Sequence, residues 1–421
     1  MSLSWAVPGT KVTYHSASTM EKVPAVVVGP SKLDGDFLSI QYEVKGRTIT
    51  HDCAPLHRLE FAEETKEPRL PSVLMEELSF LSGKPHHLSE SVLRNYDKLN
   101  SGYLDLTELK LLFTDAFPDE KFSDADMKCL MESLDLNQDG RVGLNELRAF
   151  LRLYNPSTKD ITVKTALIII DVQNDFITGS LANPYDATTI VPVINGMRDR
   201  FDVVVISYDW HPHDHCSFTA SHNAKLFPIK ETSDKFEDFG LVTLLADQDR
   251  AEHQQMLFPR HAVQGTEGGC CPPDLVVKDS DLRVYKGTKP NIDSFSAFFD
   301  NCKANDTGLT KMLEDVGVTD CYYCGLVTDI CVKSTALHGV EAGFRSYFIE
   351  DASKPLDEAN LPQTRQELSA AGVHLVSAQE ACDMAAGSKA MALRDYLSQL
   401  AKQRNAKAVH AHTQSHAHAH A

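Results

Sequence analysis

A thiol suited to covalent catalysis follows an apolar segment in the second half of the chain. Cys331 comes after the apolar run Cys321–Leu326 and before a helix-length segment. At a helix N-terminus, exposed amides and the helix dipole lower the pKa of a thiol, and the amides can bind an oxyanion. A buried, unreactive thiol is the alternative for any single Cys. The pattern marks Cys331 as a candidate nucleophile.

Asp171 and Lys286 stand at the ends of two other apolar runs, Ala166–Val172 and Leu282–Lys286. Burial at the end of a strand can raise the pKa of a carboxyl, although many such Asp residues cap helices instead. A lysine in this position can hold a carboxylate ionised and keep a thiol acidic, although a solvated lysine is the common case. Both residues are candidate partners of the nucleophile.

A second group of side chains has the composition of a metal site. Asp209 and His211 are two residues apart in an extended segment, so their side chains point to the same side. His261 offers a third ligand farther along the chain, while His213 and His215 compete with it. One Asp and two His, with positions left open for water or substrate, are typical of a catalytic metal. Zn²⁺ suits the set best, with Fe²⁺ and Mn²⁺ as alternatives.

The scaffold for these residues is predicted from the texture of the chain between Val163 and about Leu400. Continuous apolar runs alternate there with helix-length segments, which indicates strands buried on both faces. We predict a three-layer α/β/α domain over residues 163–400 with a mostly parallel sheet. Sites in such folds lie beyond the carboxyl ends of the strands. The expected strands are Ala166–Val172, Val203–Ser207, Leu282–Lys286, Cys321–Leu326, Tyr347–Glu350 and Val373–Val376.

Residues 135–146 fit the twelve-residue loop of a calcium-binding EF-hand. Such a loop needs oxygen ligands at positions 1, 3, 5 and 12, a glycine at position 6 and a backbone carbonyl at position 7. The expected Ca²⁺ ligands are the side chains of Asp135, Asn137, Asp139 and Glu146 and the carbonyl of Arg141.

Residues 97–108 follow the same template with one defect. Position 3 is Leu99, whose side chain cannot bind an ion. Because EF-hands usually occur in pairs, we predict that residues 73–155 form an α-helical EF-hand pair. Its first loop is expected to be a structural partner with weak or no calcium affinity.

The two ends of the chain carry less information. Residues 1–64 contain five short strand-like runs separated by turn signals such as Gly29-Pro30, which predicts a small SH3-like or Tudor-like β-barrel with an unknown ligand. Residues 401–421 are rich in His and Ala and are expected to be a disordered tail or an affinity tag.

Composition limits the classes of partner. The 421 residues include 41 Lys and Arg against 59 Asp and Glu, a net charge of −18. We therefore expect neither nucleic acid nor an anionic membrane as a partner. No apolar run reaches the ~20 residues that span a bilayer, and no secretory signal is visible. The ten scattered cysteines are expected to be reduced, which places the protein in the cytoplasm, or in the cytoplasm and the nucleus.

The motifs together resemble the nicotinamidase family of the isochorismatase-like cysteine hydrolase superfamily. They occur in family order over about 230 residues, and they are Ile170-Asp171-Val-Gln-Asn-Asp175-Phe176, Asp209-Trp210-His211-Pro212, Phe258-Pro259-Arg260-His261, Lys286-Gly287 and Gly325-Leu326-Val327-Thr328-Asp329-Ile330-Cys331-Val332. The resemblance implies a catalytic triad of Cys331, Asp171 and Lys286. It also implies a zinc-type metal on Asp209, His211 and His261.

The same resemblance implies how a substrate would bind. The pyridine nitrogen would approach the metal, and Phe176, Phe258 and Phe295 would pack on the ring, although the family often has Trp at the position of Phe258. The amides of Val327 and Cys331 would hold the oxyanion. The family usually has a cis peptide before the nucleophile segment, at the bond that precedes Val327.

The expected activity is hydrolysis of nicotinamide to nicotinic acid and ammonia through a thioester on Cys331, a step of NAD salvage. Two alternatives stay open: a calcium-binding scaffold or sensor with an inactive hydrolase domain, and an amidase of the same superfamily that acts on another small amide. The sequence does not decide whether calcium modulates activity, because a purely structural calcium site fits equally well. A homo-oligomer is compatible with the sequence.

Overall fold

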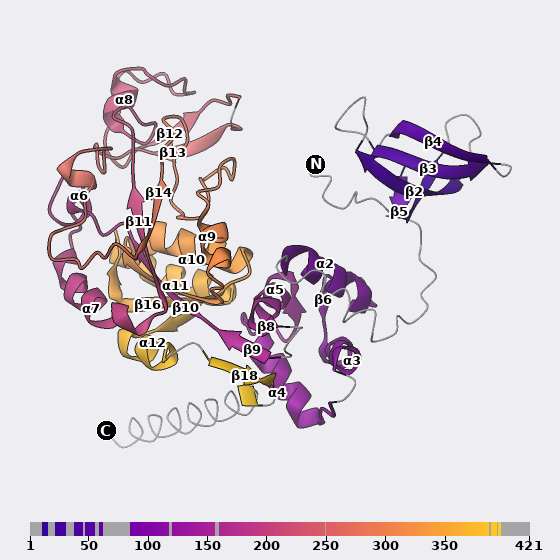
Figure 1. Ribbon diagram of the computed structural model, residues 1–421. Coiled ribbons are helices and arrows are strands. Elements are labelled where there is room, and N and C mark those ends of the chain that lie inside the picture. The colour runs from indigo at the N-terminus through magenta and orange to yellow at the C-terminus, as the bar shows by residue number, and fades with distance from the viewer. Residues whose placement is uncertain are drawn as a thin grey trace. The chain divides into compact units, whose positions relative to one another are not determined.

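Figure 1 shows the computed structural model of the chain. It describes residues 85–117, 120–155, 160–248, 250–386, 389–393 and 395–396, together with five strands near the N-terminus. The chain forms two compact units, Met1–Leu70 and Pro71–Ala421. The predicted His-rich tail, residues 401–421, lies outside the described residues. Within those described ranges, no helix combines the length and the apolar character needed to cross a membrane.

The first unit contains one antiparallel sheet in the order β4-β3-β2-β1-β5. Its strands are β1 (Lys11–His15), β2 (Lys22–Pro30), β3 (Leu38–Val44), β4 (Arg47–Ala54) and β5 (Leu59–Phe61). All five predicted strands are therefore present. The pairing leaves β4 and β5 at opposite edges of the sheet, so it does not show the closure expected of an SH3-like or Tudor-like barrel, which stays a prediction.

The second unit is built on a six-stranded sheet in the order β14-β11-β10-β15-β16-β17, in which every pair is parallel. The central strand β10 is buried at every residue, as its continuous apolar sequence predicts. The strands are β10 (Thr165–Ile170), β11 (Val203–Asp209), β14 (Leu282–Lys286), β15 (Asp320–Leu326), β16 (Arg345–Lys354) and β17 (His374–Val376).

Helices cover both faces of this sheet and create two separate apolar cores (Figure 1). Alternate residues of β10 supply them: Leu167 and Ile169 enter one core, and Ala166 and Ile168 enter the other. The first core is covered by α7 (Ile190–Met197) and α12 (Ala378–Met384). The second is covered by α9 (Leu309–Asp315), α10 (Lys333–Glu341) and α11 (Leu361–Ala370). The mostly parallel three-layer architecture is confirmed.

Shorter elements decorate the sheet. They are the helices α6 (Asn174–Ile177) and α8 (Thr219–Asn223) and the antiparallel pair β12 (Leu241–Leu244) and β13 (His253–Met256).

In the EF-hand region, the described residues form four helices around a separate apolar core. They are α2 (Pro85–Tyr96), α3 (Leu106–Ala116), α4 (Asp124–Leu134) and α5 (Leu144–Leu153). The strands β6 (Tyr103–Leu104) and β7 (Val142–Gly143) join the two loops side by side, with Leu104 opposite Val142. This pairing of the loops is the arrangement that the shared sequence template predicts.

The end of the hydrolase region returns to the EF-hand region. There β18 (Lys389–Ala392) joins β9 (Asp160–Val163) and β8 (Tyr154–Asn155) in a three-stranded sheet. Leu393 and Tyr396 enter the apolar core of the EF-hand pair. Arg345, at the start of β16, donates a hydrogen bond of 2.7 Å to the Tyr396 hydroxyl. The two regions are therefore packed against each other through side chains as well as joined by the chain.

Candidate active site

The candidate catalytic residues meet at the carboxyl edge of the parallel sheet. Asp171 follows β10, and Asp209 and Lys286 end the neighbouring strands β11 and β14, whose register places them opposite each other. Cys331 follows β15 in the π-helical turn η5 (Thr328–Val332), directly before α10. Parallel pairing thus gathers residues that are far apart in the sequence.

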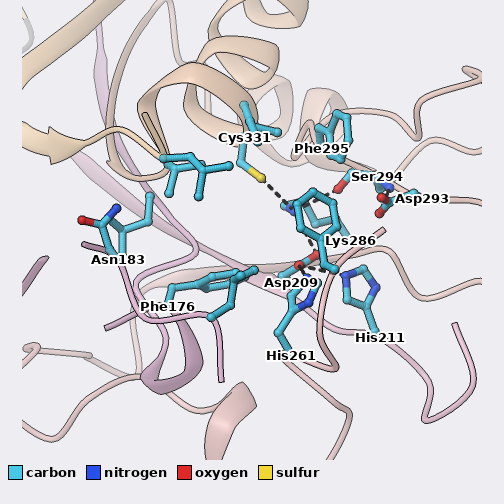
Figure 2. Close-up of a pocket in the computed structure, with 16 residues that line it drawn as sticks. Phe176, Asn183, Asp209, His211, His261, Lys286, Asp293, Ser294, Phe295 and Cys331 are labelled. Atoms are coloured by element: carbon cyan, nitrogen blue, oxygen red, sulfur yellow. Dashed lines mark hydrogen bonds and ion pairs between the residues drawn. The ribbon is translucent and has the colours of Figure 1, made fainter. Parts of the chain in front are cut away.

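Lys286 is the centre of the cluster (Figure 2). Its Nζ atom lies 2.9 Å from Asp171 Oδ2 and 2.9 Å from Asp209 Oδ1. It also donates a hydrogen bond of 2.9 Å to the carbonyl of Ser294 and lies 3.6 Å from the sulfur of Cys331. Burial lowers the pKa of this amine, but the two carboxylates outweigh burial and raise it well above its usual value. Lys286 therefore stays protonated beside the thiol.

Asp171 is held between Lys286 and a buried serine. Its Oδ1 atom accepts a hydrogen bond of 2.5 Å from the hydroxyl of Ser207. The backbone of Asp171 has a φ of 51°, in the left-handed region that few non-glycine residues occupy. Burial raises the pKa of the carboxyl, while Lys286 and Ser207 lower it in part. A carboxylate with a raised pKa is a stronger base than a solvated one.

The thiol of Cys331 differs from the sequence-based expectation. Burial raises its pKa well above the usual value, Lys286 lowers it in part, and Asp171 raises it further. Loss of hydration thus opposes the lowering of the thiol pKa that the helix dipole and the ammonium would produce. A buried thiol of this kind would need a neighbouring base to act as a nucleophile, and the Asp171 carboxyl lies next to it.

The predicted metal ligands converge on one point beside Lys286. The Nε2 atoms of His211 and His261 lie 2.9 Å and 3.4 Å from Asp209 Oδ2. Their Nδ1 atoms face the carbonyls of Gly287 and Pro259 at 2.9 Å and 2.8 Å. A carbonyl can only accept, so each Nδ1 donates its proton to a carbonyl and each Nε2 faces the Asp209 carboxylate.

Two imidazole nitrogens and a carboxylate oxygen that face one another form a group that could hold a metal ion. The three ligand atoms lie within 4.8 Å of one another, and all three residues are buried. Carbonyls that orient imidazole rings are the usual support of a metal-bound histidine. Asp209, His211 and His261 thus fit a divalent metal ion.

The two other histidines considered as metal ligands, His213 and His215, have different environments. His213 is exposed and contacts Asp214. His215 is buried and stacks on His211 with 4.0 Å between ring centroids, and burial lowers its pKa to about 3. Its ligand atom also falls within reach of His211 and Asp293 as a second group of metal-binding type.

A pocket is lined by Cys331 on one side and by the candidate metal ligands Asp209, His211 and His261, and Figure 2 shows the residues that line it. The predicted ring-binding residues Phe176, Phe258 and Phe295 all face it, as do Val327 and Cys331. The peptide bond between Leu326 and Val327 is cis. The lining residues are Phe176, Leu181, Asn183, Asp209, His211, Phe258, His261, Lys286, Asp293, Ser294, Phe295, Leu326, Val327, Ile330, Cys331 and Leu356.

Sequence reasoning missed several residues that line the pocket and one residue, Ser207, that contacts Asp171 behind it. Asn183, Asp293 and Leu356 come from loops without a motif that would single them out. Ser207 had a usable signal, because it precedes Asp209 by two residues in a strand and so shares its side of the sheet. Its contact with Asp171 follows from that position.

The second calcium loop has the backbone turn that the motif predicts. Asp135 accepts hydrogen bonds from the amides of Asp139 and Gly140 at 3.0 Å and 2.8 Å. Glu146 accepts from the amides of Leu136 and Gly143 at 2.8 Å and 2.7 Å. The oxygens of an EF-hand site are therefore gathered around one loop.

The first loop folds in the same way without the third ligand. Asp97 accepts from the amides of Ser101 and Gly102 at 2.9 Å and 2.7 Å, while Leu99 is 75% exposed. A side chain that points to solvent and carries no oxygen cannot complete a calcium site.

Comparisons with known proteins also distinguish an EF-hand region from a hydrolase region. Residues 165–380 match the isochorismatase domain, and residues 89–152 match the EF-hand domain pair. The nicotinamidase of Acinetobacter baylyi is 37% identical over 215 residues, which cover 51% of this chain and 92% of the relative. The nicotinamidase of Schizosaccharomyces pombe is 33% identical over 219 residues, with 51% and 94% covered.

A solved nicotinamidase and pyrazinamidase structure from Acinetobacter baumanii is 36% identical, with 52% of this chain and 98% of that chain covered and a TM-score of 0.46. Residues 165–380, which match the isochorismatase domain, contain the whole parallel sheet and every residue of the Lys286 cluster. The chain therefore belongs to the isochorismatase family, with nicotinamidases as homologues of its hydrolase region and an EF-hand domain pair before that region.

Proposed function

We propose that the chain is a nicotinamidase, which hydrolyses nicotinamide to nicotinic acid and ammonia in NAD salvage. The observation that carries the proposal is the position of Lys286, whose ammonium contacts Asp171, Asp209 and Cys331 at the wall of one pocket. The identity of 33–37% to curated nicotinamidases supports the same substrate.

In the first half of the reaction, Asp171 accepts the thiol proton while the sulfur of Cys331 attacks the carboxamide carbon. Burial raises the pKa of both groups, and the raised pKa of Asp171 makes it a stronger base toward the thiol. Lys286 remains protonated and offsets the negative charge on the pair. Asp171 then returns the proton to the leaving nitrogen, the C–N bond breaks and ammonia departs.

In the second half, Asp171 takes a proton from a water molecule that attacks the thioester carbon. The C–S bond breaks, nicotinic acid leaves and the thiol of Cys331 is restored. We assign the oxyanion of both tetrahedral intermediates to the backbone amides of Val327 and Cys331, since both residues line the pocket. The rings of Phe176, Phe258 and Phe295 would enclose the pyridine ring.

Asp209, His211 and His261 would hold the metal ion, for which Zn²⁺ is our first choice and Fe²⁺ or Mn²⁺ the alternatives. A bound ion would supply a Lewis acid for the pyridine nitrogen and so orient the ring. The protein contributes the orientation of the ligands, because Gly287 and Pro259 fix the two imidazoles.

Ca²⁺ is proposed for the second EF-hand loop alone. Asp135, Asn137, Asp139 and Glu146 would bind it through side chains and Arg141 through its carbonyl. Modulation of the hydrolase by this ion is part of the proposal.

Ammonia release from nicotinamide by the purified full-length protein tests the function. We expect turnover in the parent and none above background in Cys331→Ala, with the exposed Cys270→Ser as the matched control. Hydrolysis of another small amide with higher kcat/KM would favour the alternative amidase. A folded parent with no amidase activity after metal supplementation would favour the scaffold with an inactive hydrolase domain.

A further inference from the structure

The turn between α11 and β17 lies directly against the second calcium loop. Gly372, in this turn, has a φ of +91°, and a Cβ atom placed on it would lie 3.0 Å from Leu136 Cβ and 3.4 Å from the Asn137 amide nitrogen. Leu136 and Asn137 are positions 2 and 3 of the loop. The backbone of the hydrolase region thus contacts the loop with no side chain in between.

Glu146, which would be a calcium ligand, also holds the loop segment at this contact. Glu146 Oε1 accepts hydrogen bonds from the amides of Leu136 and Asn137 at 2.8 Å and 3.3 Å. At position 12 of an EF-hand, both carboxylate oxygens bind the ion. Occupancy of the loop therefore competes with the hydrogen bonds that fix the segment against Gly372.

On its other side, α11 contacts the nucleophile segment. Glu367 of α11 forms an ion pair of 2.9 Å with Lys333, which stands two residues after Cys331. Asp329, two residues before Cys331, accepts hydrogen bonds from the Leu356 amide at 2.6 Å and from the Asn360 side chain at 2.9 Å, just before α11. The segment from Leu356 to Gly372, which contains α11 and the turns on either side of it, thus contacts both the calcium loop and the residues that flank Cys331.

The exiting helix α5 is anchored to the same region. Arg152 is buried, donates to Glu314 at 2.8 Å and to the Ala342 carbonyl at 2.7 Å, and lies over the Phe344 ring at 4.1 Å. These contacts tie α5, which carries the calcium ligand Glu146 at its start, to the hydrolase region as well.

We propose that calcium in the second EF-hand is coupled to the substrate pocket through Gly372 and α11. The coupling deepens the function proposed above and rests on it for the identity of the pocket ligand. Coupling between two binding sites is reciprocal, so calcium and the pocket ligand must change each other's affinity by the same factor.

Calorimetry on full-length Cys331→Ala tests this without turnover. Nicotinamide affinity is measured with Ca²⁺ and with a calcium chelator, and Ca²⁺ affinity with and without nicotinamide. We expect equal factors of about 5-fold or more in the two directions, the lower range of allosteric coupling. Glu146→Gln should abolish the effect, and Glu108→Gln, at the same position of the first loop, should retain it.

The route is tested on the same background with Glu367→Gln, which removes the ion pair to Lys333. Arg365→Gln is the matched control. Arg365 is on the same helix as Glu367, and its substitution breaks an exposed ion pair with Glu350 of β16. We expect Glu367→Gln to bind calcium normally with at least half of the coupling lost, and Arg365→Gln to keep it. Unchanged coupling in Glu367→Gln would overturn the route.

Hydrogen exchange separates failure of the coupling from failure of the substrate assignment. Calcium should change exchange in residues 361–372 and 328–333 whatever the substrate. Changed exchange without nicotinamide binding would retain the coupling and reject the substrate. No calcium binding, or calcium binding with unchanged exchange and unchanged nicotinamide affinity, would reject the coupling.

Discussion

Lys286 shows at the residue scale how a single buried cation can hold two carboxylates and a thiol together. Asp171 and Asp209 both form an ion pair with it, and Asp209 also contacts His211 and His261. Removing one partner of a buried ion pair leaves the other charge without compensation, which costs about 3–5 kcal/mol. We therefore expect Lys286 to contribute to stability as well as to the proposed catalysis.

We predict that Lys286→Met lowers the free energy of unfolding by about 3 kcal/mol and abolishes ammonia release. Urea denaturation followed by circular dichroism measures the first effect. Lys303→Met is the control, because the Lys303–Glu341 pair is half-exposed and such pairs contribute at most about 1 kcal/mol. Equal stability losses in both variants would contradict the central role of Lys286.

Ser207 is a positioning residue, since it touches Asp171 and does not line the pocket. Its hydrogen bond lowers the pKa of the carboxyl, so Ser207→Ala should raise that pKa further. The base is active as the carboxylate, and kcat/KM therefore falls as the pH drops through this pKa. We predict that the acid limb of the kcat/KM profile moves upward by about one pH unit in Ser207→Ala.

The control for this shift is Ser221→Ala, which removes another buried hydroxyl outside the site. It should leave the pH profile in place. A Ser207→Ala profile that is lower at every pH but not displaced would indicate a structural role alone.

At the scale of elements, the parts that could be predicted are those with a local signal. Continuous apolar runs located all six strands of the parallel sheet, and the fixed spacing of carboxylates located the calcium loops. The pKa of Cys331 could not be predicted, because burial by distant segments outweighs its place before α10. The pairing of β18 with β9 could not be predicted from the sequence either. A four-residue strand is too short to show a hydrophobic periodicity, and its partner is set by tertiary packing.

This pairing leads to a prediction about Tyr396. Its ring is buried in the core of the EF-hand pair and its hydroxyl accepts from Arg345. We predict that Tyr396→Ala lowers the free energy of unfolding by about 3–4 kcal/mol, and Tyr396→Phe by about 1 kcal/mol. Chemical denaturation measures both, with Met384→Ala at an exposed position as the control. A Tyr396→Ala loss no larger than that of Met384→Ala would show that the C-terminal segment is dispensable.

At the scale of the whole molecule, buried contacts between the EF-hand pair and the hydrolase region lead us to predict that the two regions unfold together. Arg152 and Tyr396 each join the two regions through buried side chains. A ligand that binds only the folded state stabilises everything that unfolds with its site, by about 2.7 kcal/mol at a concentration of 100 times Kd. Calcium bound to one region should therefore protect the other.

The chain offers a direct reporter for this prediction, because Trp5 and Trp210 are its two tryptophans. Trp210 lies between the candidate metal ligands Asp209 and His211, so Trp5→Phe leaves tryptophan fluorescence from the hydrolase region alone. We predict that calcium raises the thermal midpoint of Trp210 fluorescence in this background. Glu146→Gln should remove the increase, while Glu108→Gln should keep it, because the first loop lacks an oxygen at Leu99. The opposite result would be a Trp210 midpoint that does not change with calcium while circular dichroism shows a separate calcium-dependent transition. It would mean that the two regions unfold independently.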